Sequence, residues 1–184
     1  MRPGPWRRDG VEAMTLSVRR TPAAPSFAAA AEDHLDEVNA YLVYLTRDAS
    51  LAEDLTAETF EKALRLWGRF DPRRASARTW LCQIARTTAL DWFRADERRR
   101  RREQAAASPE AQEARFVEGL SPALEQALGE LTAGEREVIA LRILLELDND
   151  GAARVLGISP TAASTRLSRA LKRLEEKVGG DVLV

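Results

Sequence analysis

The sequence predicts an all-α protein of two small helical domains, a bundle of three to four helices and a four-helix domain, joined by a flexible linker. Ala, Leu, Arg and Glu dominate the chain and aromatic residues make up only 6% of it, a composition that favours helices. Helix-start signals also recur at the spacing of short helices. With 184 residues, 45% of them hydrophobic and 31% charged, the chain can bury two modest cores.

Two helices are expected at the start of the first domain, which we place at residues 27–103. In residues 27–46, apolar side chains recur at helical spacing, at Leu35, Val38, Leu42 and Leu45. Ser50 and Glu53 then have the spacing of a capping box, which predicts a second helix through about Trp67. The core residues expected from this helix are Leu55, Phe60, Ala63, Leu64 and Trp67.

A basic loop and a long helix complete the first domain. Gly68 and Pro72 interrupt the helical pattern, so residues 68–75 are expected to form a loop. A third helix follows and runs into the five consecutive arginines at 98–102. Its apolar face is expected to consist of Trp80, Leu81, Ile84, Ala85, Thr88 and Trp92.

Three segments are expected to lie outside the domains. Residues 1–26, with several prolines, predict a disordered extension within which Met14 is an alternative start. Residues 104–120, rich in Ala, Gln and Glu, predict a linker, and residues 179–184 a frayed tail.

The second domain, residues 121–178, is marked by four helix-start signals. Each places Ser, Thr or Asp at an N-cap, and two of them add Pro at the first helical position. The signals are Ser121-Pro122, Thr132 with Glu135 as a capping box, Asp148, and Ser159-Pro160. Gly157 marks the end of the helix that Asp148 begins, because glycine readily adopts the left-handed conformation past a helix C-terminus. Two helices joined by this tight turn predict a helix-turn-helix.

The last helix divides into an apolar and a cationic face. The apolar face contains Ala163, Leu167, Ala170, Leu171, Leu174 and Val178. The opposite face contains Thr161, Thr165, Arg169 and Lys172, flanked by Arg166 and Arg173. Such a face suits the second helix of a helix-turn-helix, whose N-terminal residues enter the DNA major groove. An ordinary surface helix with solvated cations is the alternative interpretation.

The net charge of −1 conceals a polarised distribution. Residues 27–61 contain nine acidic residues and one basic residue, a net charge of −8, whereas residues 62–103 contain thirteen basic and five acidic residues, a net charge of +8. Acidic surfaces suit a protein partner and basic surfaces suit nucleic acid, so the first domain is expected to have two binding faces.

Nothing in the sequence indicates catalysis, a metal or a cofactor. There is no glycine-rich phosphate loop, and the single cysteine, Cys82, and single histidine, His34, are too far apart to suggest a metal site or a nucleophile with its base. We therefore expect neither an enzyme nor a small-molecule substrate. No apolar run approaches the about 20 residues that span a bilayer, and residues 1–26 lack the apolar segment of a signal peptide. A cytoplasmic protein without membrane insertion is expected.

Several motifs carry a family resemblance. Residues 52–63 (AEDLTAETFEKA), 78–86 (RTWLCQIAR) and 91–94 (DWFR), followed by the arginine run, resemble region 2 of the extracytoplasmic-function (ECF, group IV) sigma factors of bacterial RNA polymerase. The caps and helix-turn-helix in residues 120–177 resemble region 4 of the same family. The two motif sets occur in the family's order and cover most of the chain, which makes the pair much more specific than either alone.

Some positions depart from the family pattern. Many relatives have Asn at the position of Thr87 and an aromatic residue at that of Cys82, which leaves part of the −10 preference open. The usual Gly-Leu-Ser-Tyr before the helix-turn-helix is replaced by residues 146–149, Glu-Leu-Asp-Asn. Gly151 lies in the first turn of the next helix, where glycine costs up to about 1 kcal/mol of helix stability. The fold is expected to tolerate it.

The resemblance implies a transcription initiation factor that binds bacterial core RNA polymerase, recognises the −10 and −35 elements of promoter DNA and assists promoter opening, under the control of an anti-sigma factor. The core-binding residues that it implies are Glu53, Asp54, Glu58 and Glu61. The −10 residues are Arg73, Arg74, Arg78, Trp80, Arg86, Thr87, Thr88, Asp91 and Arg94. The −35 residues are Thr161, Ser164, Thr165, Arg166, Ser168, Arg169, Lys172 and Arg173. The cations suit phosphates, while Trp80 and Trp92 either stack on bases or belong to the core.

The alternative is a stand-alone helix-turn-helix regulator whose first domain senses a ligand or dimerises. A sigma factor requires core polymerase for promoter-specific binding, whereas a repressor binds a duplex operator alone, normally as a dimer. The two classes are therefore distinguished by one transcription experiment.

Overall fold

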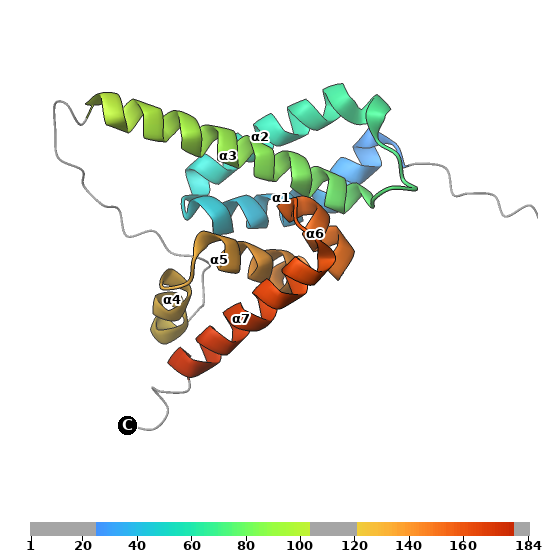
Figure 1. Ribbon diagram of the computed structural model, residues 1–184. Helices are drawn as coiled ribbons and strands as arrows, with labels where there is room; N and C mark the ends of the chain where they lie inside the picture. The colour runs from blue at the N-terminus through green and yellow to red at the C-terminus, as the bar shows by residue number, and fades with distance from the viewer. Residues whose placement is uncertain (1–24, 104–120, 179–184) are drawn as a thin grey trace, which may run out of the picture.

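The computed structural model describes residues 25–103 and 121–178, and all the regular structure in these two ranges is helical. The segments expected as the linker and the C-terminal tail, and nearly all of the expected N-terminal extension, lie outside the described residues. The all-α prediction is confirmed for the part of the chain that the structure describes. The helices form two groups, which Figure 1 shows in blue to green and in yellow to red.

The N-terminal bundle consists of three α-helices that pack on one another. The Ser26 hydroxyl caps the first helix by accepting from the Ala29 N–H at 3.2 Å. The elements are α1 (Phe27–Thr46), α2 (Ala49–Leu66), the short 3₁₀ turn η1 (Trp67–Arg69) and α3 (Ala77–Glu103). The core of the bundle includes Val38, Leu42, Leu55, Leu81 and Ala85.

Two details of this bundle differ from the sequence prediction. Helix α2 is capped by Asp48, whose carboxylate accepts from the Leu51 N–H at 3.1 Å, and not by Ser50. The reason is that α1 ends at the left-handed Arg47, which leaves Asp48 extended and in the N-cap position. Leu64 was expected in the core but is 57% exposed, and Leu35, one of the apolar residues at helical spacing in the first helix, is 47% exposed.

The C-terminal domain contains the four predicted helices, and each begins at its predicted cap. Thr132 and Glu135 form the expected capping box, the Ser159 hydroxyl accepts from the Ala162 N–H at 3.2 Å, and Gly157 is left-handed at φ 68°. The elements are α4 (Pro122–Gly129), α5 (Ala133–Ile139), the π-helical turn η2 (Ala140–Leu144), α6 (Asn149–Leu156) and α7 (Pro160–Val178). In α7 the expected apolar face is buried at Ala163 and Ala170, whereas Leu171 is 41% exposed.

The connection between α5 and α6 was not predicted. The Leu145 N–H donates to the Ala140 carbonyl at 2.9 Å, five residues back, so the end of α5 widens into the π turn η2. Glu146 follows with φ 47°, a left-handed conformation that a side chain disfavours. This is the position at which the sequence pattern of the family has glycine.

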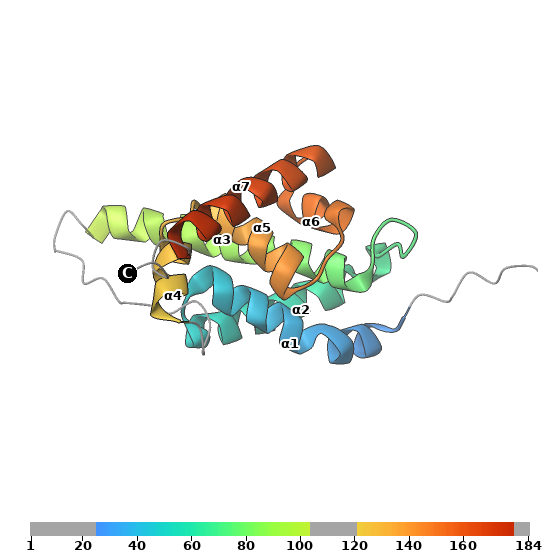
Figure 2. The ribbon, with the colours of Figure 1, turned by 90° about the horizontal axis from the view of Figure 1, so that it is seen from below.

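The two helical groups pack against each other. Helix α6 packs on α3 and η2 packs on α1, an arrangement visible from two directions in Figure 1 and Figure 2. Buried residues of both groups, such as Leu42 and Leu141, belong to one contiguous hydrophobic cluster. The Gln83 amide of α3 also donates to the Arg154 carbonyl of α6 at 3.1 Å.

A buried polar network crosses this interface. The Glu137 side chain of α5 is 10% exposed and pairs with Arg86 of α3 through two bonds, Nε to Oε1 at 2.6 Å and Nη2 to Oε2 at 3.2 Å. The fully buried Tyr41 of α1 donates its hydroxyl to the same Oε1 at 3.0 Å. One carboxylate therefore accepts from two helices of the other group, which satisfies a charge that burial alone makes costly.

Glu146→Gly is predicted to raise the free energy of unfolding by about 0.5 to 1 kcal/mol, because relief of the left-handed strain exceeds the added flexibility of the unfolded chain. Gly157→Ala tests the same reasoning in the opposite direction and should lower it by about 1 kcal/mol. Urea unfolding followed by circular dichroism measures both. Destabilisation by Glu146→Gly would contradict a strained left-handed backbone at residue 146.

Neither tyrosine is predicted to ionise in the folded protein near its usual pKa of about 10. Burial, reinforced by the neighbouring Glu137, raises the pKa of Tyr41 well above its ordinary value, and burial raises the pKa of Tyr44 to about 12. Above about pH 10 the unfolded state therefore binds fewer protons than the folded state, and stability falls as the pH rises.

An absorbance titration of the phenolates tests this prediction. Little tyrosinate should appear near pH 10 while the helices stay intact, and Tyr44 should ionise in the folded protein only near pH 12. Ionisation near pH 10 with the helices intact contradicts it.

Candidate nucleic-acid interface

The N-terminal half of α7 presents an open polar face. Thr161, Thr165, Ser168 and Arg169 are exposed there, and Arg169 forms no ion pair with another described residue. With the cap residues Thr132 and Ser159, several of these side chains line a shallow hollow between α5 and α7. A guanidinium and hydroxyls on the first turns of the second helix of a helix-turn-helix are placed to meet base edges and phosphates.

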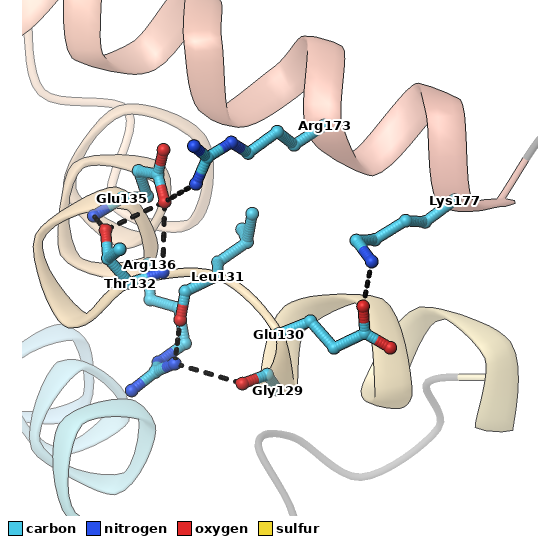
Figure 3. Close-up of polar contacts among 8 residues, drawn as sticks. All are labelled: Gly129, Glu130, Leu131, Thr132, Glu135, Arg136, Arg173 and Lys177. Carbon is cyan, nitrogen blue, oxygen red and sulfur yellow. Dashed lines mark hydrogen bonds and ion pairs between the residues drawn. The ribbon is translucent and has the colours of Figure 1, made fainter.

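The C-terminal half of α7 is held by carboxylates of its own domain, as Figure 3 shows. Arg173 pairs with Glu135 of the capping box at 2.9 Å, and Lys177 pairs with Glu130. Hydrogen bonds from Thr132, together with Arg173, lower the pKa of Glu135. The free cations of α7 are thereby concentrated near its N-terminus.

Asn149 joins the two helices of the helix-turn-helix. Its amide donates to the Pro160 carbonyl at 3.0 Å, and its amide oxygen accepts from the Ser164 hydroxyl at 3.0 Å. Ser164, which the sequence grouped with the −35 residues, is therefore engaged in holding α6 to α7. The sequence analysis did not single out Asn149. The only signal for it was its position as the first residue of α6, directly after the Asp148 cap.

The other −35 candidates lie along the same helix. Arg166 is half-buried and folds back against Gly134 of α5. Lys172 is exposed and lies 3.8 Å from the Glu176 carboxylate. All eight candidates are thus on α7, and Ser164, Lys172 and Arg173 have partners within the domain.

The basic loop and the start of α3 hold several of the −10 candidates. Arg73 and Arg74 are exposed in the loop, where Arg73 forms two 3.0 Å bonds with Asp71. Arg78 is half-buried and pairs with Glu37 of α1 at 2.9 Å. Only Arg74 of these cations forms no ion pair with a described residue.

Trp80 and Trp92, the two tryptophans considered as base-stacking residues, are half-buried. Trp80 contacts Trp67 and Phe70, with ring centroids 5.5 and 5.6 Å away, and both Trp80 and Trp92 pack against the core. Trp92 also makes an edge contact with Phe93. Packing accounts for most of the surface of each ring, and the exposed remainder of Trp80 borders the basic loop.

Further along α3 the −10 candidates separate into three environments. Thr87 is exposed, and Asp91 and Arg94 form an exposed pair at 3.1 Å. Arg86 faces the C-terminal domain and is paired with Glu137. Thr88 is only 1% exposed and accepts from Lys62 of α2 at 3.2 Å, so its place is inside the bundle and not on a DNA-binding surface.

The four acidic candidates form an exposed face on α2. Glu58 pairs with Lys62 and Glu61 with Arg65, each at 2.6 Å, whereas Glu53 and Asp54 form no ion pair with a described residue. The packing partners of α2 are chiefly α1 and α3. This face therefore remains open when the two helical groups are packed together.

The described residues offer little for other chemistry. They contain no group of three side chains suited to hold a metal, and burial raises the pKa of Cys82 to about 12, which keeps the thiol protonated. None of the helices in the described ranges is long and apolar enough to cross a membrane.

Both helical groups match families of known proteins. Residues 30–100 match the Sigma-70 region 2 family and residues 121–174 match Sigma-70 region 4. The chain is 30% identical to the ECF RNA polymerase sigma factor SigX of Bacillus subtilis over 74% of this chain and 75% of that one. It is 37% identical to ECF sigma factor SigC of Mycobacterium tuberculosis over 71% of both chains.

A solved structure has the same fold. The sigma factor RpoE of Bartonella quintana, in complex with the anti-sigma factor NepR, superposes with a TM-score of 0.70 at 24% identity, covering 83% of this chain and 96% of that one. With both regions matched in order and relatives at 30% and 37% identity over 75% and 71% of their length, the chain belongs to the ECF family of RNA polymerase sigma factors.

Proposed function

We propose that this ECF sigma factor docks on bacterial core RNA polymerase through the acidic face of α2, reads the −35 element with α7 and engages the −10 element with the basic loop and α3. The observation that carries the proposal is the separation of charge over the described surface. Exposed carboxylates gather on α2, whereas Arg74 of the loop and Arg169 near the start of α7 are exposed cations that form no ion pair with a described residue. One face suits a basic protein surface and the others suit phosphates.

The roles within each DNA-binding surface follow from their surroundings. On α7, Arg169 is free to reach a base edge, whereas Arg173 is held at the side of the helix by Glu135. On the N-terminal bundle, Arg73, Arg74, Arg78, Arg86 and Arg94 are proposed as phosphate contacts, and the exposed Thr87 and Asp91 as sequence-reading positions. Thr88 is left out because it is buried.

An anti-sigma factor is proposed as the regulatory partner. The Bartonella quintana sigma factor that shares this fold was solved bound to one. A protein that holds the factor away from polymerase must cover surfaces used for docking, and the exposed α2 face remains open in the packed chain. The factor is proposed to act in the cytoplasm, where core polymerase and promoter DNA are found.

The docking role is tested by run-off transcription with purified core polymerase on the promoter upstream of the factor's own gene. The chain should give transcripts only together with core polymerase. Glu53→Lys with Asp54→Lys should lower affinity for core at least about tenfold, because rim charges of the wrong sign cost one to several kcal/mol across an interface. The matched control is Glu32→Lys with Asp33→Lys, an adjacent exposed Glu-Asp pair on α1.

Circular dichroism checks that all variants keep their helices. Equal core affinity of the α2 and α1 variants contradicts docking through α2. Specific binding of a duplex promoter by the chain alone favours a stand-alone regulator instead.

The −35 role is tested by selection on randomised −35 sequences. Arg169→Ala should cost about 1 to 3 kcal/mol and relax the preference at one position. Arg173→Ala should weaken binding to all sequences alike, because its guanidinium is at the helix edge and can reach only the backbone. An unchanged preference profile for Arg169→Ala rules out its base-reading role.

A further inference from the structure

Apolar packing holds α7 in its domain only weakly. Within this helix the buried residues are Ala163 and Ala170, whereas Leu167 and Leu174 are half-buried and Leu171 is exposed. A buried methyl group makes far fewer van der Waals contacts than a buried leucine. Packing therefore leaves the rotation of α7 about its own axis poorly determined, and polar contacts have to fix it.

The polar contacts of α7 with other helices divide between its two halves. Glu135 and Glu130 hold the C-terminal half through Arg173 and Lys177, as Figure 3 shows. In the part of the chain that the structure describes, Asn149 of α6 is the one side chain of another helix that forms hydrogen bonds with the N-terminal half. This is the half that is proposed to read the −35 element.

Asn149 binds α7 at two points that lie one helical turn apart. Its amide nitrogen donates to the Pro160 carbonyl, and its amide oxygen accepts from the Ser164 hydroxyl, each at 3.0 Å. Ser164 stands at the boundary between the two faces of α7, after Ala163 of the apolar face and before Thr165 of the polar face. A bond at the edge of a helix resists rotation about the helix axis.

The surroundings of Asn149 indicate that it acts on α7 and not directly on DNA. Asp148 and Asp150, both exposed, flank it in the chain, and carboxylates repel phosphates. The family pattern Gly-Leu-Ser-Tyr has tyrosine at this position. An amide carries its donor and its acceptor on separate atoms, whereas a phenol has a single oxygen, so this pair of bonds is a feature of this chain.

We propose that Asn149 is a positioning residue for −35 recognition, which fixes the rotation of α7, and that Ser164 serves this contact instead of reading a base. The proposal rests on the proposed function for the role of α7, and it adds a residue that sets sequence selectivity. Side chains extend about 5 to 6 Å from a helix axis, so a rotation of about 10° moves them by about 1 Å. Hydrogen bonds to base edges tolerate only about 0.5 Å.

The test uses the full chain assembled with core polymerase, in selections on randomised −35 sequences. Asn149→Ala should lower the enrichment of preferred bases about two- to tenfold, the range that one or two hydrogen bonds are worth. The loss should extend over several −35 positions, because rotation moves every reading side chain, whereas Arg169→Ala should affect one. Affinity for a promoter with a scrambled −35 element should stay unchanged, since phosphate contacts carry no sequence information.

Ser164→Ala distinguishes a positioning role from a base contact, and as a change at an exposed residue it also serves if Asn149→Ala does not fold. It should broaden the preference at the same positions as Asn149→Ala, and less strongly. The double variant should be no worse than Asn149→Ala alone, because the two side chains share one bond. A loss confined to one −35 position, or additive effects in the double variant, overturns the proposal.

Gln126→Ala is the matched control, because it also removes an exposed amide from the C-terminal domain. The Gln126 amide bonds only within its own helix, to Glu130 at 3.5 Å, so the −35 preference should stay unchanged. Circular dichroism checks that every variant keeps its helices. An unchanged preference in folded Asn149→Ala, or equal broadening by Gln126→Ala, overturns the proposal.

Failure of the positioning role can be told apart from failure of the proposed function. If Arg169→Ala changes the preference and Asn149→Ala does not, the positioning role alone is refuted. If neither substitution changes it, α7 does not read the −35 element and both proposals fail.

Discussion

The arrangement of the whole molecule depends on the burial of the Glu137 carboxylate between the two helical groups. A charge in that position is tolerated only if hydrogen-bond donors surround it, and Tyr41 and Arg86 supply them from two helices of the other group. The apolar cluster around the network spans both groups, but apolar packing is not directional. The polar network determines which helices meet and at what register.

The same principle of local neutralisation shapes the exposed surface. On α7 the capping box does two jobs, since Glu135 caps α5 and also holds Arg173. Among the candidate cations, Arg74 of the basic loop and Arg166 and Arg169 of α7 form no ion pair with a described residue. Ion pairing therefore leaves fewer cations available to bind DNA than the charge counts of the sequence indicate.

Departures from the family pattern have identifiable physical consequences. Glu146 occupies a left-handed backbone position that suits glycine, while Gly151 stands in the first turn of α6, where a Cβ would lie 2.7 Å from the Asp148 carboxylate and 3.1 Å from the Thr79 hydroxyl. The first introduces strain beside the helix-turn-helix and the second permits a close contact between the groups. Asn149 adds hydrogen bonds across the helix-turn-helix that the sequence did not suggest.

The sequence by itself determined the helices of the described ranges and the family. N-caps, a C-terminal glycine and apolar spacing act over three or four residues, so the sequence alone located the caps at Ser121, Thr132, Asp148 and Ser159. The cap of α2 was misplaced because Asp48 and Ser50, two nearby residues, are both good N-cap residues. Tertiary structure decided what distant residues do. The sequence could not show that Thr88 faces Lys62, or that Arg86 meets Glu137, 51 positions away. Such pairings depend on how whole helices pack, and the apolar periodicity of one helix does not identify the helix that packs against it.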